Sequence, residues 1–520
     1  MTRAISVIPE PVHWELKDGE FVLDTACIVV AEAGAEEVAE GFVRSLYLGL
    51  GREYVVFPVP IEGKHKIVRL RLDPALKCLG VEGYRLLVTS DQVELTAAEP
   101  AGLFYATQTF RQLMPPEIFS QAPVPGIEWA IPCVEIEDTP RFPWRGAMLD
   151  VCRHFMPKEF ILKYIDLLAL HKCNTLHWHL TEDQGWRIEI KKYPRLTEVG
   201  AWRKETVANH GDEESTYFVN DGLPHGGFYT QDEAREVVEY AKKRFVRVVP
   251  EIEMPGHSQA AIAAYPELGN TGKQIEVCKH WGIIEHVFNV EESTLHFLQN
   301  VLDEVIEIFP SPFIHIGGDE VPKKEWKNSP AAQKRMLDLG LRDEEELQSY
   351  FIRRMDAFLA GRGRRLIGWD EILEGGLAPG AVVMSWRRED GGITAANAGH
   401  DVVMAPYQYV YLNTQQIRED TRRKDDSYLA LEKVYQYEPV PAAIDPARTH
   451  HVLGAQVELW SESIEDPARM EYMSFPRLCA LAEVNWTPAG KKNYDDFRTR
   501  LQVHLRRLDG LKVNYCKKME

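Results

Sequence analysis

The chain has 520 residues, which predicts two or more domains unless a barrel takes up most of its length. Acidic residues (79) outnumber basic residues (60), and the net charge of -19 disfavours nucleic acid and anionic membrane surfaces as partners. Hydrophobic residues make up 45% of the sequence, so large cores can form, but no apolar run is long enough to span a membrane.

Neither the N-terminus nor the cysteines indicate an exported protein. The first nine residues lack the apolar core of a secretion signal, and the eight cysteines are scattered without C-x-x-C spacing. Scattered cysteines beside apolar neighbours are typical of reduced thiols rather than of disulfides or a zinc site. We therefore expect a cytoplasmic protein, and we predict no metal and no cofactor.

Residues 1–138 are predicted to form a small α+β domain with a structural role. We expect strands at residues 21–31, 66–72 and 84–96 and helices at residues 36–50 and 101–114. This region has no paired acids, no metal-ligand spacing and no phosphate-binding loop. Prolines within residues 115–132 mark the connection to a second domain.

Residues 139–520 show short apolar strands that alternate with amphipathic helices. The predicted strands are residues 146–153, 175–183, 246–257, 313–320, 365–371, 381–387, 401–413 and 452–462. The clearest helices are residues 157–171, 231–244, 294–309 and 344–360. Eight strand and helix units predict an α/β fold, a parallel (β/α)8 TIM barrel, with its active site at the C-terminal ends of the strands.

Two adjacent carboxylates, Asp319 and Glu320, follow the fourth predicted strand directly after two glycines. The glycines end the strand and allow the backbone to turn. Two neighbouring carboxylates repel each other when both are ionised, so one should have a raised pKa and could act as a general acid. Taken alone, the pair could equally be a solvated acidic turn.

The other predicted strands also end in residues that can bind a polar ligand. These are Asp150, Arg153 and His154, then His177, His179 and Glu182, then Glu251, Glu253 and His257, then Trp369, Asp370 and Glu371, then Trp386, then Tyr407, Tyr409, Tyr411 and Asn413, and finally Trp460 and Glu462. Tryptophans at separate strand ends beside carboxylates predict a sugar site, where aromatic faces cover the C–H surface and polar groups bind the hydroxyls.

The spacing of the acids indicates the class of reaction. A retaining glycosidase with a protein nucleophile has two carboxyls about 5–5.5 Å apart, and an inverting one about 6.5–9.5 Å, on either side of the scissile bond. The adjacent Asp319 and Glu320 do not suit that arrangement. They suit a reaction in which the acetamido group of the substrate is the nucleophile, because it needs one protein acid and a second carboxylate that orients the amide.

The chain resembles family 20 glycoside hydrolases, the β-N-acetylhexosaminidases, over nearly its full length. The resemblance is carried by RGAMLDVCRHF at 145–155, HWHLTEDQGWR at 177–187, EIEMPGH at 251–257, HIGGDE at 315–320, GWDE at 368–371 and LWSE at 459–462. Segments 8–11 and 102–109 resemble the small N-terminal domain of that family. The resemblance implies an exo-acting enzyme that removes terminal β-linked GlcNAc or GalNAc with retention of configuration.

The resemblance also implies a role for each matching residue. Glu320 would protonate the glycosidic oxygen and later deprotonate water, while Asp319 would hold the acetamido N–H and stabilise an oxazolinium intermediate. His257 and Glu182 would support the acid. The implied substrate-binding residues are Tyr411 for the acetamido carbonyl, Trp369, Trp386 and Trp460 around its methyl group, and Arg153, Glu462 and Asn413 for the hydroxyls.

Two residues depart from the family pattern. Glu182 and Asn413 stand where the family commonly has Asp, so the support of the acid and the preference for the outer hydroxyls are expected to differ. The loops at residues 206–227 and 270–290 are expected to shape the mouth of the site. The expected ligand is an amino-sugar oligosaccharide or glycoconjugate, and the expected assembly is a monomer or homodimer.

The sequence also allows two alternative functions. A metal-dependent barrel hydrolase could use His177, His179, His257 and Asp319 as ligands. A catalytically silent sugar-binding protein could be built on the same barrel. Loss of activity in EDTA would favour the first alternative, and binding without turnover would favour the second.

Overall fold

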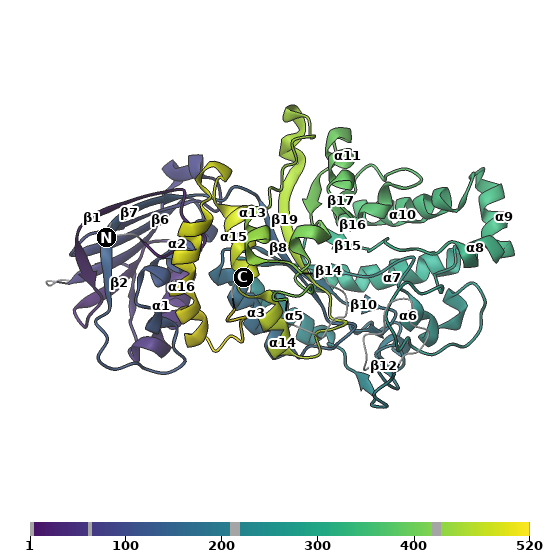
Figure 1. Ribbon diagram of the computed structural model, residues 1–520, viewed down its shortest axis with the longest axis horizontal. Coiled ribbons are helices and arrows are strands. Elements are labelled where there is room, and N and C mark those ends of the chain that lie inside the picture. The colour runs from purple at the N-terminus through teal and green to yellow at the C-terminus, as the bar shows by residue number, and fades with distance from the viewer. Residues whose placement is uncertain (1–4, 61–64, 208–218, 419–427, 519–520) are drawn as a thin grey trace.

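The computed structural model describes residues 5–60, 65–207, 219–418 and 428–518. A sheet domain formed by the first part of the chain lies at one end of the molecule, and a barrel formed by the later part lies at the other (Figure 1). Residues 1–4 of the predicted N-terminus and residues 208–218 of the predicted mouth loop lie outside the described residues. Among the described residues, no helix combines the length and the apolar character that a bilayer crossing requires.

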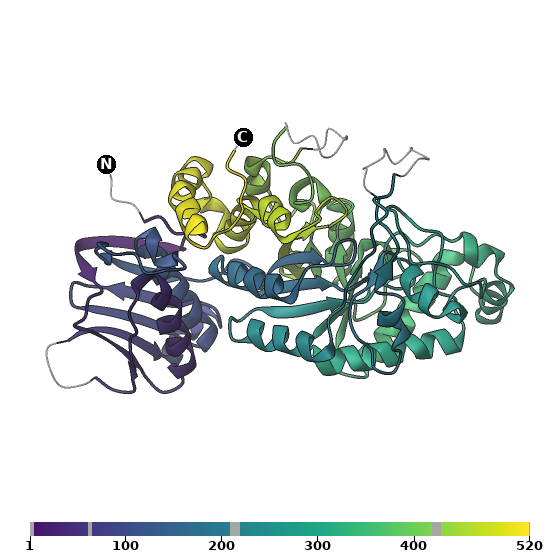
Figure 2. The ribbon, with the colours of Figure 1, turned by 90° about the horizontal axis from the view of Figure 1, so that it is seen from below.

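The N-terminal domain is a seven-stranded mixed sheet with helices packed on it, which agrees with the predicted α+β class (Figure 2). Its strands have the order β1-β7-β5-β6-β4-β2-β3. Their bounds are β1 His13–Val22, β2 Cys27–Ala31, β3 Val56–Phe57, β4 Lys66–Leu72, β5 Tyr84–Val88, β6 Gln92–Ala97 and β7 Ala130–Asp138. Helices α1 (Glu36–Leu50) and α2 (Pro100–Leu113) contact each other and the sheet. Strand β5 alternates buried and exposed residues because only one sheet face meets these helices.

Several strand predictions in the N-terminal domain are wrong. The single strand expected at residues 84–96 is the antiparallel pair β5 and β6, and β3 and most of β1 were not predicted. The single strand expected at residues 21–31 is two strands, because the chain turns between Asp24 and Cys27, whose N–H donates to the Asp24 carbonyl at 3.3 Å. Strand β7 was not predicted, because its start lies in the proline-containing stretch that indicated a connection. Strand β7 pairs antiparallel with both β1 and β5. Its hydrogen bonds to these two strands stabilise it, whereas its own sequence lacks a clear strand pattern.

The second part of the chain is a closed barrel of parallel strands in the order β14-β15-β16-β17-β18-β19-β8-β9, which confirms the predicted (β/α)8 fold. The strands are β8 Trp144–Asp150, β9 Thr175–His179, β14 Arg247–Glu251, β15 Phe313–His315, β16 Arg365–Trp369, β17 Val382–Ser385, β18 Val402–Met404 and β19 Val452–Leu459. All residues of β8 and β9 are buried, as expected of strands covered on both faces.

Helices cover the outside of the barrel and join its strands (Figure 1). The longer ones are α3 Lys158–Leu170, α5 Gln231–Lys242, α7 Glu292–Ile308, α9 Pro330–Leu339, α10 Glu344–Ala360, α11 Asp390–Ala398, α14 Pro467–Ser474, α15 Arg477–Trp486 and α16 Tyr494–Gly510. Shorter helices are α4 Arg195–Glu198, α6 Gln259–Ala264, α8 Lys324–Asn328, α12 Tyr407–Val410 and α13 Leu431–Gln436. Two short antiparallel pairs are the hairpin of β10 Thr181–Glu182 with β11 Gly185–Trp186, and β12 Trp202–Arg203 with β13 His225–Gly226.

The strand predicted at residues 401–413 is shorter than expected. Strand β18 ends at Met404, and the chain then forms the short helix α12. Pro406 caps that helix, and a proline has no N–H for a strand ladder but suits the start of a helix. Tyr407 and Tyr409 therefore lie on a helical turn, and Tyr411 follows it.

Helix α16 ties the two parts of the molecule together. Arg507 of α16 donates to the carbonyl of Gln112, and Arg500 donates to the carbonyl of Val7. In Figure 1 this yellow helix lies between the N-terminal sheet and the barrel. We retain the division at residues 138 and 139 as a proposal, which is supported by the end of β7 at Asp138 and the start of β8 at Trp144.

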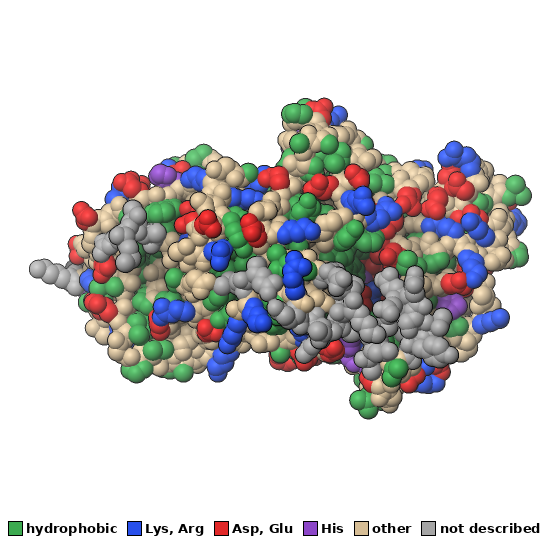
Figure 3. Space-filling view, viewed as in Figure 1, with side chains coloured by type: hydrophobic (Ala, Val, Ile, Leu, Met, Phe, Trp, Pro, Cys, Tyr) green, Lys and Arg blue, Asp and Glu red, His purple; other side chains and the backbone are tan. Residues whose placement is uncertain are grey.

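Charged side chains of both signs occur on the face shown in Figure 3. On the described part of the face in Figure 3, acidic and basic side chains are interspersed. The net charge of -19 is therefore not collected in one acidic area of that face.

Candidate active site

The acid pair lies at the C-terminal end of β15, on a backbone turn that requires glycine. Gly317 and Gly318 have φ of 68° and 90°, in the left-handed region. A Cβ atom on Gly317 would lie 1.6 Å from Oε2 of Glu253, so any other residue there would have to displace the buried Glu253 side chain. The turn leaves Asp319 largely buried, with 8% of its surface exposed, whereas the side chain of Glu320 is 32% exposed.

His257 joins the acid pair to two further carboxylates. Its Nε2 lies 3.6 Å from Oδ2 of Asp319 and 3.6 Å from Oε2 of Glu320. Its Nδ1 lies 2.8 Å from Oε1 of Glu182 and 3.2 Å from Oδ2 of Asp183. The structure thus brings together His257, Glu182 and both predicted acids. Asp183 was missed by the sequence analysis.

The charges around His257 favour its protonated form. Burial lowers the pKa of His257, but Glu182 and Asp319 outweigh burial and raise this pKa well above its usual value. Burial raises the pKa of Asp319 well above its usual value, and Glu371 and Glu320 raise it further against the effect of His257. The raised pKa expected within the acid pair is therefore found at Asp319.

The carboxyl group of Glu253 lies beneath the acid pair. Burial, followed by the charge of Asp319, raises the pKa of Glu253 well above its usual value. Both carboxyl oxygens of Glu253 lack a hydrogen-bond partner among the described residues. Glu253 also contacts the turn at Gly317, so it supports the backbone of the acid pair from below.

Glu251 is the centre of a second buried cluster. Its carboxylate oxygens lie 2.5 Å from Nδ1 of His179, 2.9 Å from Nε2 of His177 and 2.7 Å from Nδ1 of His315. The Nε1–H of Trp369 donates to Oε1 of Glu251 at 2.8 Å. The cluster thereby fixes the Trp369 ring.

This cluster bears on the alternative of a metal-dependent enzyme. His177, Glu251 and His315 lie close enough to share an ion. However, the four ligands suggested by the sequence do not form one cluster. His177 and His179 surround Glu251, whereas His257 and Asp319 lie together at the acid pair.

Four aromatic rings from different strand ends line the site. Trp369 and Trp460 have ring centroids 5.7 Å apart, and Tyr411 and Trp460 have centroids 6.3 Å apart. Trp386 and Tyr411 are nearly parallel, with centroids 6.1 Å apart and an angle of 17°. All four residues were predicted, and the structure brings them together.

Arg153 connects the predicted hydroxyl-binding residues to the support of the acid. Its guanidinium lies 3.0 Å from Asp150, 3.0 Å from Glu182 and 3.9 Å from Glu462, and it stacks over Trp460 at 5.0 Å. Its Nε–H also donates to Oε1 of Gln184 at 3.1 Å, so the contact with Glu462 is the longest polar contact that the guanidinium makes here. Asn413 follows Tyr411 at the same end of the barrel and is half-buried.

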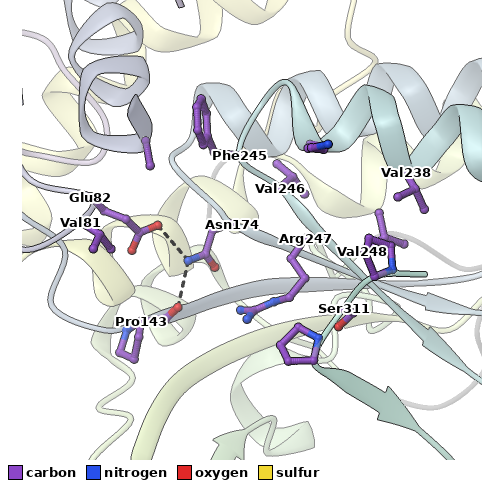
Figure 4. A pocket seen from close by; sticks show the side chains of 14 residues that line it. Val81, Glu82, Pro143, Asn174, Val238, Phe245, Val246, Arg247, Val248 and Ser311 are labelled. Atoms are coloured by element: carbon purple, nitrogen blue, oxygen red, sulfur yellow. Dashed lines mark hydrogen bonds between the residues drawn. The ribbon is translucent and has the colours of Figure 1, made fainter. Parts of the chain in front are cut away.

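A cavity of about 510 Å³ lies away from this site, at the opposite end of the barrel strands (Figure 4). It is lined by Glu82, Phe245, Arg247 and others near the starts of β9 and β14. The Asn174 amide there donates to Glu82 at 3.0 Å and to the Pro143 carbonyl at 2.9 Å. The N-terminal end of a barrel generally serves stability, and none of the predicted site residues lines this cavity.

Two family models cover most of the chain. The model described as glycosyl hydrolase family 20, catalytic domain, matches residues 142–489, and the model described as glycosyl hydrolase family 20, domain 2, matches residues 4–139. A protein named beta-hexosaminidase from Porphyromonas gingivalis is 44% identical over 99% of this chain, which spans 64% of that relative. A beta-hexosaminidase from Vibrio furnissii is 40% identical over 92% of this chain and 76% of the relative.

Solved structures show the same architecture across both domains. The GH20 beta-N-acetylhexosaminidase from Streptomyces coelicolor A3(2) has a TM-score of 0.85 and 29% identity, covering 99% of this chain and 97% of that structure. The GH20 exo beta-N-acetylglucosaminidase from Vibrio harveyi in complex with N-acetylglucosamine has a TM-score of 0.84 and 35% identity, covering 99% and 79%.

Proposed function

The chain belongs to glycosyl hydrolase family 20 and is a glycoside hydrolase, and from this premise we propose that it is an exo-acting β-N-acetylhexosaminidase. It would remove terminal, non-reducing β-linked GlcNAc or GalNAc from an oligosaccharide or glycoconjugate. The names of its relatives support this activity, since both the Porphyromonas and Vibrio furnissii proteins are beta-hexosaminidases.

One observation carries the proposed mechanism. Asp319 and Glu320 both lie 3.6 Å from the same nitrogen of His257, so they approach the substrate from one side of the site. A protein nucleophile would instead have to face the acid across the scissile bond. The arrangement supports a reaction in which the substrate supplies its own nucleophile.

In the first step of this reaction, the acetamido carbonyl oxygen attacks the anomeric carbon and the glycosidic C–O bond breaks. The leaving oxygen takes the proton of Glu320, and the sugar becomes an oxazolinium ion. In the second step, the Glu320 carboxylate removes a proton from a water molecule that attacks the anomeric carbon. The bond from that carbon to the acetamido oxygen breaks, and the acetamido group is restored. Two inversions at that carbon give net retention.

Asp319 would bind the acetamido N–H and stabilise the cation. Although burial and its acidic neighbours raise the pKa of Asp319 in the free site, a positive charge on the cyclising amide favours the ionised carboxylate. His257, charged by Glu182 and Asp319, would keep the two acids in place from behind.

The aromatic rings and Arg153 would select the sugar. Trp369, Trp386 and Trp460 would enclose the acetamido methyl group, and Tyr411 would donate to the acetamido carbonyl. Arg153, Glu462 and Asn413 would bind the ring hydroxyls. Asn413 can donate as well as accept, which bears on the choice between GlcNAc and GalNAc.

The decisive experiment compares release of p-nitrophenol from the β-N-acetylglucosaminide, the β-N-acetylgalactosaminide and the plain β-glucoside, with EDTA present. We expect turnover of both acetamido sugars and none of the glucoside. Cleavage of the glucoside at a similar rate would require a protein nucleophile. Activity that EDTA abolishes and a divalent metal restores would establish the metal-dependent alternative, and binding without turnover would establish a sugar-binding protein.

A further inference from the structure

A second pair of adjacent carboxylates, Asp370 and Glu371, has no part in the proposed reaction. The pair follows Trp369 at the end of β16, and its side chains are buried, with 1% and 7% of their surface exposed. Buried carboxylates are costly unless they make hydrogen bonds. Their partners should therefore indicate what the pair does.

Both carboxylates bind the same neighbouring residue, Trp386. Oδ2 of Asp370 accepts the backbone N–H of Trp386 at 3.0 Å and that of Arg387 at 3.2 Å. Oε2 of Glu371 accepts the indole N–H of Trp386 at 2.9 Å. Asp370 thus fixes the backbone of Trp386, and Glu371 fixes its ring.

The orientation of the Trp386 ring depends on this bond to Glu371. Trp386 lies after β17, is only partly buried, and is nearly parallel to Tyr411 on one side. A half-buried indole whose N–H had no partner could turn toward solvent about its side-chain dihedral angles. The bond from its Nε1–H to the buried Glu371 carboxylate removes that freedom.

We propose that Glu371 is a positioning residue that holds the Trp386 ring as one wall of the acetamido pocket and so determines which N-acyl groups the enzyme accepts. This inference rests on the proposed function. The wall would leave room for an acetyl methyl group and exclude a longer acyl chain.

The charge of Glu371 is not required for this role. Burial, followed by the charge of Asp370, raises the pKa of Glu371 to about 7, while the bond from Trp386 and the charge of Arg387 lower it. The carboxyl group keeps an oxygen that can accept the indole N–H in either form. A glutamine at this position should therefore hold the ring as well, whereas an alanine should not.

The test compares kcat/KM for p-nitrophenyl β-glucosaminides that carry an N-acetyl or an N-propionyl group. For Glu371→Ala we expect about a tenfold lower kcat/KM on the N-acetyl substrate and a ratio of N-acetyl to N-propionyl activity that is smaller by about fivefold. Glu371→Gln should keep the wild-type ratio. Glu374→Gln is the matched control, because Glu374 is 42% exposed and accepts from Arg387 at 2.8 Å rather than from Trp386.

A second variant keeps the test valid if Glu371→Ala does not fold. Trp386→Phe lacks the indole N–H and should reduce the ratio in the same direction, and adding Glu371→Gln to it should change nothing further. The positioning role would be overturned if the wild-type enzyme is active and either Glu371→Ala or Trp386→Phe keeps the wild-type ratio of N-acetyl to N-propionyl activity. Wild-type enzyme that fails on the N-acetyl substrate would overturn the proposed function instead.

Discussion

The backbone at two residues of the site adopts a conformation that side chains disfavour. His257 and Glu320 both have φ of 47°, in the left-handed region, although neither is glycine. Such conformations cost free energy and persist where the surroundings impose them, often at functional sites. Here the glycine turn at Gly317 and the contacts of His257 with Glu182 and Asp183 impose them.

Glu320 is the residue on which turnover should depend most. Glu320→Gln keeps the shape of the side chain but cannot donate a proton, so kcat on unactivated β-N-acetylglucosaminides should fall by about 10² to 10⁴. Affinity for a thiazoline analogue of the intermediate should change little. Steady-state kinetics and inhibition constants measure both effects. Unchanged kcat would remove Glu320 from the role of acid.

Asp319 should matter chiefly for formation of the intermediate. Asp319→Asn removes the charge that stabilises the oxazolinium ion, and we expect kcat to fall by about 10² to 10³ and the thiazoline to bind less tightly than to wild type. A substrate with an activated leaving group separates this step from protonation, because Glu320→Gln should recover on it and Asp319→Asn should not. Normal formation of the intermediate in Asp319→Asn would contradict its role.

The sequence predicted the main residues of the active site but not all of their partners. Asp319, Glu320, His257 and Glu182 were predicted, whereas the contact of Asp183 with His257 was not. In an extended strand, adjacent residues point to opposite faces, so two neighbouring acids should not reach one histidine. The tight β10–β11 hairpin, which turns directly after Glu182, cancels that alternation.

Among the elements, the strands of the barrel were predictable and several boundaries were not. The apolar runs that become β8 and β9 are buried throughout, β14 is buried in all but Arg247, and all three are recognisable from composition alone. Complete burial also explains why helix α15 was not predicted. All ten of its residues are buried, so it lacks the polar face that marks an amphipathic helix.

Helices α3 and α16 meet at two buried histidines. Nε2 of His171 lies 2.8 Å from Nε2 of His504, and Arg507 lies 3.3 Å from Nδ1 of His504. Burial lowers the pKa of His171 to about 4 and that of His504 well below its usual value, with Arg507 adding to both effects. Neither ring can take a proton without facing another positive charge.

This contact should make the protein sensitive to acid. An unfolded histidine titrates near pH 6.5, so above that pH neither state binds a proton and His171 has no effect on the pH dependence. Below pH 6.5 the unfolded state binds a proton that the folded state refuses until about pH 4. The free energy of unfolding should therefore fall by about 2 kcal/mol between pH 7 and pH 5 through His171 alone.

Urea unfolding at pH 7 and pH 5 measures that loss. His171→Asn should lower stability at both values, because it leaves a gap in the contact, but the difference between the two should shrink. His296→Asn is the matched control, since His296 is exposed on α7 and should leave the difference unchanged. Equal losses in wild type and His171→Asn would show that other groups cause the acid sensitivity.

Across the whole molecule, buried polar contacts join the N-terminal domain to the barrel. Asp138, at the end of β7, accepts from Lys172 at 2.8 Å, from the indole of Trp486 at 2.8 Å and from the Tyr84 hydroxyl at 2.6 Å. Lys172 lies just before β9 and Trp486 ends α15, so barrel elements supply both partners. The two domains could be predicted from sequence, but this junction depends on isolated residues that form no local pattern.

Removing the charge of Asp138 tests whether this junction holds the domains together. The side chains of Asp138 and Lys172 are both fully buried, so Asp138→Asn leaves the ammonium of Lys172 without a counter-charge and should lower the free energy of unfolding by about 3–5 kcal/mol. Glu137→Gln, one residue away, removes a 41% exposed partner of Arg85 and should cost about 0–1 kcal/mol. Adding Lys172→Met to Asp138→Asn removes the stranded charge and should recover most of the loss, as urea unfolding would show. A small loss in Asp138→Asn, or no recovery in the double variant, would mean that apolar packing and α16 hold the two domains together without this ion pair.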